Sequence, residues 1–132
     1  MLAAMQESQP FTVAILEDDA DVAHTLQVVL RDMGLRVLVC SLRHDVLGSI
    51  VDIQPQLVIS DVRMGRLDGI EIFHQLRADT RTRDVPVIFF TATEQRVRSR
   101  IPDYREQDAY FVGKPNIPRL TALIEEIRDR HT

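Results

Sequence analysis

Five short apolar runs alternate along the chain with segments of helical periodicity. The runs occupy residues 13–16, 35–39, 57–59, 87–90 and 110–112. They are rich in β-branched or aromatic residues, and three are apolar almost throughout, as expected for strands buried on both faces. Apolar residues at helical spacing follow four of the runs, at Val22, Leu26, Val29, Leu30 and Met33, at Val46, Leu47, Ile50 and Val51, at Ile70, Phe73 and Leu76, and at Leu120, Leu123, Ile124 and Ile127.

This alternation predicts an α/β fold of the (βα)5 type, with one helix after each strand. Such an order requires a parallel sheet with right-handed crossovers. The fourth helix is unusual because Pro102 falls within its segment, 94–107, and proline breaks the hydrogen bonding of a helix. We expect a short or interrupted helix there that carries Arg96, Arg98, Arg100 and Arg105. A solvent-exposed charged face is the favoured interpretation of these arginines, and a dedicated binding patch is the alternative.

Composition limits the class of protein. The chain has 132 residues, of which 45% are hydrophobic, enough for one domain with a single core. We assign that domain to residues 10–132 and predict a mobile tail at residues 1–9, which are polar and aperiodic. The net charge of −4 argues against nucleic-acid binding through a broad basic face. No run reaches the ~18 apolar residues of a membrane span.

The only cysteine, Cys40, cannot form an internal disulfide, which favours the reducing cytoplasm. Because Cys40 ends an apolar run, we expect it to be buried. The basic residues are also uneven, since fifteen of the sixteen are arginine and Lys114 is the only lysine.

Ionic and hydroxyl side chains follow directly after four of the five apolar runs. In an open parallel sheet, ligands bind at the carboxyl ends of the strands. We therefore expect one edge of the sheet to gather Glu17, Asp18, Asp19, Asp61, Thr91 and Lys114.

The chemistry of these groups suits phosphoryl transfer. Crowded carboxylates repel one another unless a cation is present, and hard oxygen ligands favour Mg²⁺. A lysine ammonium is a compact charge suited to a phosphoryl oxygen, and a threonine hydroxyl adds a neutral donor. No Ser/His/Asp arrangement is evident, so a carboxylate is the natural nucleophile and would form an aspartyl phosphate.

Four motifs carry a resemblance to a known family. They are Val13–Asp19, Leu57–Met64 continued by Leu67–Gly69, Val85–Ala92 and Phe111–Pro115. Together they resemble the response-regulator receiver domains of two-component signalling, of the flavodoxin-like chemotaxis-regulator type. The resemblance covers about residues 11–130 and implies a doubly wound, five-stranded parallel sheet in the order 2-1-3-4-5.

The resemblance implies a phosphoacceptor and a metal site. Asp61 would accept a phosphoryl group from a histidine kinase or phosphotransfer protein. Mg²⁺ would be held by Asp61, by Asp18 directly, by Glu17 through water and by the backbone carbonyl of Arg63. Asp19 would then be a helix cap, an ordinary role for aspartate before a helix.

The remaining motif residues would act on the phosphoryl group. Thr91 and the N–H of Ala92 would hold it, and Lys114 would pair with it. Phe111 falls at the aromatic switch position, where a fixed core residue and a moving one are equally good readings. The bond from Lys114 to Pro115 corresponds to the family's cis peptide.

The resemblance also implies a place in signalling. The domain would be a cytoplasmic phosphoprotein and not an enzyme, although it would assist its own phosphorylation and dephosphorylation. An effector domain or partner protein would bind the face formed by the fourth helix, fifth strand and fifth helix, which is also a candidate homodimer contact. Neither nucleic acid nor membrane is expected to bind this domain directly.

Two departures from the family pattern concern the loops. Gly65 stands where the family usually has proline, and we expect it to loosen the loop after Asp61. Glu106–Ala109 replaces the usual Gly-Ala pair before the fifth strand.

Two alternative functions stay open. The unusual fourth helix is compatible with a pseudo-receiver that binds partners without cycling phosphate. Asp19-Ala-Asp21 imitates the Asp-x-Asp of haloacid-dehalogenase-type phosphohydrolases, a less favoured alternative.

Overall fold

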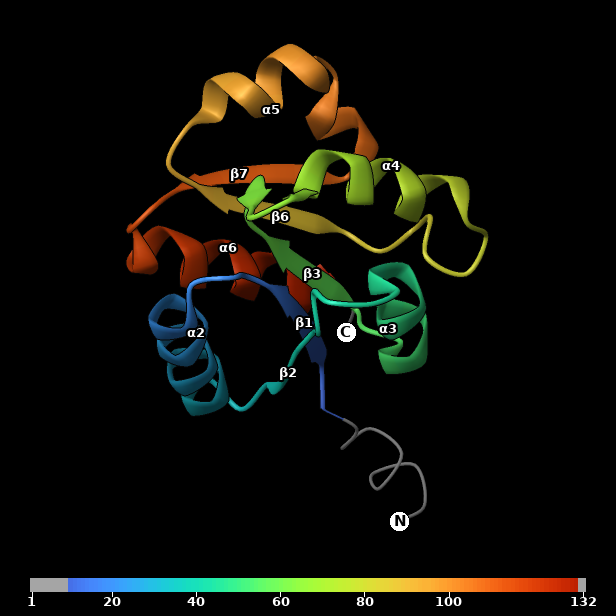
Figure 1. Ribbon diagram of the computed structural model, residues 1–132. Coiled ribbons are helices and arrows are strands. Elements are labelled where there is room, and N and C mark those ends of the chain that lie inside the picture. Colours follow the sequence, from blue (N-terminus) through green and yellow to red (C-terminus); the bar gives the residue numbers. More distant parts are fainter. Residues whose placement is uncertain (1–9, 131–132) are drawn as a thin grey trace.

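The computed structural model describes residues 10–130, which form a five-stranded parallel sheet with helices packed against it (Figure 1). The strand order β2-β1-β3-β6-β7 confirms the expected order 2-1-3-4-5. The predicted mobile tail at 1–9 lies outside the described residues. The strands are β1 (Thr12–Leu16), β2 (Arg36–Val39), β3 (Leu57–Ser60), β6 (Val87–Thr91) and β7 (Ala109–Gly113).

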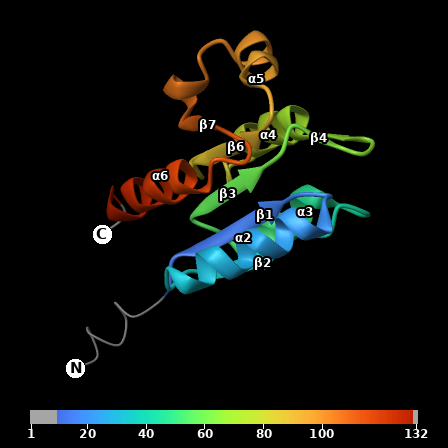
Figure 2. The ribbon, with the colours of Figure 1, turned by 90° about the vertical axis from the view of Figure 1, so that its left-hand side faces the viewer.

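Helices cover both faces of the sheet (Figures 1 and 2). One face packs against α2 (Ala20–Asp32) and α6 (Ile117–Arg130), and the other packs against α3 (Val46–Ile53) and α4 (Gly69–Ala78). α5 (Glu94–Arg100) packs with the second group, at the β7 edge of the sheet. Within the part of the chain that is described, no helix is long and apolar enough to cross a membrane.

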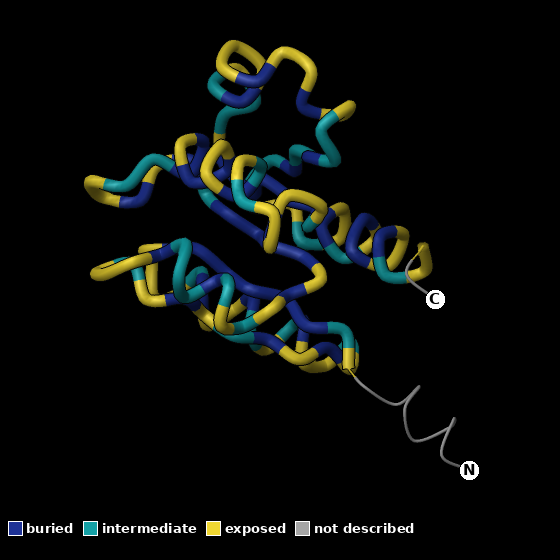
Figure 3. The backbone as a smooth tube through the Cα atoms, turned by 90° about the vertical axis from the view of Figure 1, so that its right-hand side faces the viewer, coloured by how far each residue is buried: buried dark blue, intermediate teal, exposed yellow. Residues whose placement is uncertain are grey.

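The central strands are buried along their whole length, as their continuous apolar runs predict. Every residue of β1, β3 and β6 is buried, and these strands form the dark interior in Figure 3. Because side chains alternate along a strand, Val13 and Ile15 face the α2–α6 layer while Ala14 and Leu16 face the α3–α4 layer. Both layers therefore fix the carboxyl ends of these strands.

The first helix begins and ends as its sequence predicts. The carboxylate of Asp19 accepts hydrogen bonds from the N–H groups of Asp21 and Val22, which caps α2. At the other end Gly34 takes a left-handed conformation with φ of +83°. The connection from β1 to α2 is therefore short, and it holds Glu17 and Asp18 at the sheet edge.

The fourth helix is interrupted, as Pro102 predicts. α5 ends at Arg100, and a 3₁₀ helix, η1 (Tyr104–Gln107), leads into β7. The Arg77 guanidinium of α4 holds the end of this segment by donating to the carbonyl oxygens of Gln107 and Asp108. It also donates to the carbonyl oxygen of Val85, which precedes β6.

The connection into β7 needs a left-handed residue. Asp108, with φ of +57°, takes this conformation directly before Ala109. Aspartate tolerates this region better than most residues, so the missing Gly-Ala pair does not prevent the turn.

The loop after Asp61 contains an element that the sequence did not predict. It forms an antiparallel hairpin of β4 (Arg63–Met64) and β5 (Leu67–Asp68). Gly65 occupies the first turn position with φ of +62°, which proline cannot adopt because its ring fixes φ near −65°. The replacement of proline by glycine therefore gives this loop a defined turn.

Candidate functional site

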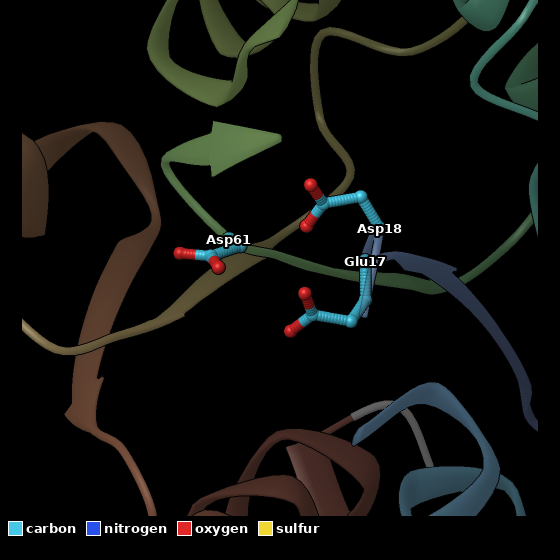
Figure 4. Close-up of side chains that lie close together, drawn as sticks. All are labelled: Glu17, Asp18 and Asp61. Atoms are coloured by element: carbon cyan, nitrogen blue, oxygen red, sulfur yellow. The ribbon is translucent and has the colours of Figure 1, made fainter. Parts of the chain in front are cut away.

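Three carboxylates meet at the carboxyl edge of the sheet. Glu17 and Asp18 follow β1, and Asp61 follows the adjacent strand β3. Each offers an oxygen atom, and these atoms lie within 4.8 Å of one another (Figure 4). Oxygen ligands in this number fit a hard cation such as Mg²⁺. The structure thus brings together the three acidic side chains that the resemblance assigns to the metal.

Lys114 joins two of these carboxylates. Its Nζ atom donates to Asp61 Oδ2 at 2.8 Å and to Glu17 Oε1 at 2.6 Å. The residue directly follows β7, where its N–H donates to the carbonyl oxygen of Thr91 at 2.9 Å. The bond from Lys114 to Pro115 is cis, as the resemblance predicts. One ammonium against three carboxylates leaves an excess of negative charge for a divalent cation.

Burial sets the electrostatics of this group. Burial raises the pKa of Glu17, and the hydrogen bond from Lys114 offsets this only in part. Burial also lowers the pKa of Lys114, but its bonds to Asp61 and Glu17 outweigh that effect and raise it overall. Lys114 therefore stays an ammonium. Asp18 is exposed and open to a ligand from solvent.

Backbone contacts fix the orientation of Asp61. Its Oδ1 atom accepts a hydrogen bond from the N–H of Val62 at 2.7 Å, so both carboxylate oxygens are engaged. Gly69, the first residue of α4, lies against the same segment: a Cβ there would come within 2.0 Å of the Asp61 carbonyl oxygen. Gly69 is thus a positioning residue that sequence reasoning did not single out. Its place in the motif Leu67–Gly69 was the available signal.

The two residues expected to hold a phosphoryl group end β6. Thr91 is buried, and Ala92, directly after it, is exposed. Thr91 pairs with Gly113 across the β6–β7 ladder, and Lys114 is the next residue after Gly113 in the chain. Thr91 therefore lies beside the backbone that carries Lys114. Phe111, on the same strand as Gly113, is half-buried and packs against the core beneath α5.

Three other side chains, those of Asp19, His24 and Cys40, lie outside the group of three carboxylates. Asp19 caps α2 and lies outside the group of three carboxylates, so the Asp-x-Asp reading gains no support from the geometry. His24 is exposed on α2. Cys40 is buried as predicted, and burial raises the pKa of its thiol to about 11.

An apolar pocket beside Lys114 was not predicted. It has a volume of about 230 Å³ and lies between α2, the end of β6 and the start of α6. Its walls include Val22, Leu26, Phe90, Pro115 and Ile117. The sequence could not reveal it, because its residues come from three distant segments.

Comparison with known proteins identifies the family. The response regulator receiver domain family matches residues 13–125. The response regulator Rre1 of Synechocystis sp. is 29% identical over 125 residues, which make up 93% of this chain and 54% of that protein. The chain thus spans about half the length of the curated relatives it matches.

Solved structures share the same fold. The crystal structure of a putative response regulator from Chloroflexus aurantiacus matches with a TM-score of 0.77 and 27% identity, covering 90% of this chain and 98% of that one. TrrA from Thermotoga maritima, in complex with Mg(2+)-BeF, matches with a TM-score of 0.74 and 21% identity over 88% of this chain and 97% of that one. With the family match over most of its length, the chain belongs to the response regulator receiver domain family.

Proposed function

We propose that this domain is a phosphoacceptor receiver, in which Asp61 takes a phosphoryl group from a histidine kinase or phosphotransfer protein. The observation that carries the proposal is the Lys114 ammonium, which contacts both Asp61 and Glu17 at one edge of the sheet. A structural ion pair would need one carboxylate, whereas a phosphoacceptor site needs the acids and the cation together.

In the transfer step a carboxylate oxygen of Asp61 attacks the phosphorus atom of phosphohistidine. The new O–P bond forms as the N–P bond breaks, and the imidazole nitrogen keeps the electron pair. Lys114, already within hydrogen-bond distance of Asp61, is placed to pair with the charge on the phosphoryl oxygens. Positioning and electrostatics supply most of the catalysis in such a transfer.

Mg²⁺ is the cofactor that we propose for this site. Glu17, Asp18, Asp61 and the carbonyl oxygen of Arg63 would hold it. When bound, it would neutralise negative charge on the carboxylates and on the transferred group. The complex of the structurally similar TrrA with Mg(2+)-BeF is consistent with this proposal.

Thr91 and Ala92 would hold the transferred group and report its presence. The Thr91 hydroxyl and the Ala92 N–H donate to the phosphoryl oxygens in this proposal. Movement of Thr91 toward the phosphoryl group would leave space near the paired strand β7, where Phe111 is half-buried. Phe111 would then turn inward and change the surface formed by α5, β7 and α6.

Partners would bind at two places. The apolar pocket beside Lys114 is suited to the kinase or phosphotransfer protein, because an apolar contact there would deliver a phosphohistidine next to Asp61. The surface of α5, β7 and α6 would contact an effector domain, a partner protein or a second copy of the chain. The greater length of the relatives supports an attached effector domain.

We place this function in the cytoplasm, and we propose that the phosphoryl transfer is a signalling step rather than enzymatic turnover.

The experiment is phosphorylation with phosphoramidate and Mg²⁺, followed by intact-mass spectrometry. The unmodified chain should gain one acid-stable, base-labile phosphoryl group, and Asp61→Asn should gain none. Asp45→Asn is the matched control, since Asp45 caps α3 away from the site, and it should behave like the unmodified chain. Phosphorylation of Asp61→Asn at the unmodified rate would refute the assignment.

A beryllofluoride titration separates the receiver from a pseudo-receiver. Addition of beryllofluoride and Mg²⁺ should shift the NMR signals of Asp61, Thr91 and Phe111 together. No shift at any of these residues would favour an interaction module that does not cycle phosphate.

A further inference from the structure

A second charged pocket lies between the β4–β5 hairpin and α5. It has a volume of about 380 Å³, and its charged lining residues are Arg63 and Asp68 from the hairpin and Arg96 and Arg100 from α5. The volume is at the lower end of the range of small-ligand sites. The carboxylate group around Asp61 takes no part in this pocket.

The spacing of the arginines on α5 separates two sets. Arg96 and Arg100 are four residues apart and therefore lie on one face of the helix, toward the hairpin. Arg98 lies on another face, where its guanidinium pairs with Glu94 at 2.7 Å. The pocket thus takes alternate arginines of the helix and leaves Arg98 as a natural control.

Positive charge in the pocket exceeds negative charge. Arg100 pairs with Asp68, the only carboxylate in the lining. Within residues 10–130, the side chains of Arg63 and Arg96 have no hydrogen bond or ion pair with another residue. Three guanidinium groups against one carboxylate leave two positive charges uncompensated, in a chain whose net charge is −4. An anion with two charges would balance them.

We propose that this pocket binds the phosphate dianion of a small phosphorylated molecule. Guanidinium groups offer paired N–H donors that match phosphate oxygens, and a phosphate monoester carries about −1.5 to −2 charges at pH 7. This inference goes beyond the proposed function, because the ligand does not transfer its phosphoryl group and Asp61 does not contact it.

The pocket connects the ligand to the position of α5. Asp68 Oδ1 accepts from the N–H of Ile70 and caps α4, while Oδ2 pairs with Arg100. A bound phosphate would compete with Asp68 for Arg100 and so release α5 from the hairpin. Arg63 adds a second connection, since its side chain lines the pocket and its carbonyl is the proposed metal ligand.

The test is an NMR titration of the unphosphorylated domain with inorganic phosphate, at constant ionic strength and without divalent metal. Amide signals of residues 63–68 and 94–100 should shift and saturate. Arg96→Gln should weaken binding roughly tenfold, because a hydrogen bond to a charged group is lost. The control Arg98→Gln should bind within about twofold of the unmodified chain. Asp68→Asn keeps the capping oxygen but removes the competing charge, so it should bind phosphate severalfold more tightly.

Other results would overturn the proposal. Equal shifts with sodium chloride, or equal weakening in Arg96→Gln and Arg98→Gln, would show charge screening without a site. Tighter binding of a pentaglutamate peptide than of phosphate and glycerol phosphate would assign the pocket to an acidic protein segment instead. Preference for glycerol phosphate over inorganic phosphate would identify an ester as the ligand, and equal affinity would identify free phosphate. Asp61→Asn should bind phosphate normally even though it cannot be phosphorylated, which separates this inference from the proposed function.

Discussion

Two helical segments flank β7 in the chain: α5 with η1 comes before the strand, and α6 comes after it. Different kinds of contact hold these two segments to the sheet. α6 has fourteen residues and buries four apolar side chains, Leu120, Leu123, Ile124 and Ile127. α5 has seven residues and buries only Val97. Ile101 and Tyr104, just after the helix, add the remaining buried contacts.

Polar contacts take the place of apolar ones at α5. Arg100 pairs with Asp68, and Glu94 accepts from both Arg98 and the hydroxyl of Tyr104. Such contacts lie at the surface and exchange with water at little cost, whereas the contacts of α6 are lost only when the core opens. The comparison teaches that buried apolar side chains hold α6, whereas polar contacts near the surface hold much of α5.

The largest expected effect comes from the core side of this comparison. Leu120→Ala should lower the free energy of unfolding by about 2–5 kcal/mol, since it removes a fully buried leucine and leaves a cavity. Val97→Ala, at α5, removes fewer buried atoms and should cost less. Urea denaturation of both variants measures the difference. A larger loss for Val97→Ala would contradict the view that α5 is the weakly attached helix.

The next effect concerns the connection between α4 and the segment that follows α5. Arg77→Met keeps much of the side-chain volume but removes a donor from three carbonyl oxygens, of which that of Asp108 keeps another, the N–H of Val87. It should therefore destabilise the domain by about 1.5–3 kcal/mol. Hydrogen exchange should increase most in η1. As a control, Arg81→Met removes an exposed arginine whose ion pair is with Asp79 and should change stability little. Equal effects of the two variants would show that the Arg77 contacts do not hold η1.

A smaller effect is expected from a single hydroxyl. Tyr104→Phe removes the hydrogen bond to Glu94 and should cost about 1 kcal/mol. Faster hydrogen exchange should be confined to α5 and η1. The matched control is Tyr110→Phe, because the Tyr110 hydroxyl contacts Asp108 and Arg130 and should affect the end of α6 instead. Identical exchange patterns for the two variants would argue against separate attachment of α5 and α6.

The smallest effect is a difference in pH dependence between the two helices. The hydrogen bond from Tyr104 lowers the pKa of Glu94; burial raises that of Asp68, but the bond from Arg100 and others lower it overall. Groups with lowered pKa values stabilise the fold above their ordinary values of 4.5 and 3.8, and this contribution is lost as the pH falls further.

Between about pH 5 and pH 3, α5 should therefore lose protection from hydrogen exchange before α6 does. The measurement is exchange by mass spectrometry, corrected for the intrinsic pH dependence of the amide rate. Asp68→Asn should reduce the difference. Simultaneous loss at both helices would show that acid unfolds the domain as a whole.

The prediction of the fold succeeded where periodicity was strong and failed where a turn decided the structure. The strands and the apolar faces of α2 and α6 followed from spacing alone, because burial on one or both faces fixes which positions must be apolar. The β4–β5 hairpin was missed. Gly65 was recognised as a departure from the family pattern, but its effect depends on φ, which composition does not give.

The gathering of the acidic residues and the lysine at one edge was predicted from the sequence, although their contacts were not. The carboxyl ends of parallel strands meet at one edge, so Glu17, Asp61 and Lys114 could be placed together without coordinates. The closeness of Gly69 to the Asp61 carbonyl could not be foreseen, since it depends on how α4 approaches β3. Both pockets were missed for a similar reason, because their walls come from segments far apart in the sequence.

The sequence by itself determined the order of strands and helices, the interruption at Pro102, the caps of α2 and the gathering of acidic residues and one lysine at the carboxyl edge of the sheet. These features depend on local backbone preferences and on apolar periodicity, which act over a few residues. The tertiary structure decided which arginines have partners. Arg98 and Arg100 lie two residues apart on one helix, yet one pairs within the helix and the other with Asp68. Such pairing depends on long-range packing, because charges interact with whatever the fold brings within a few ångströms of them.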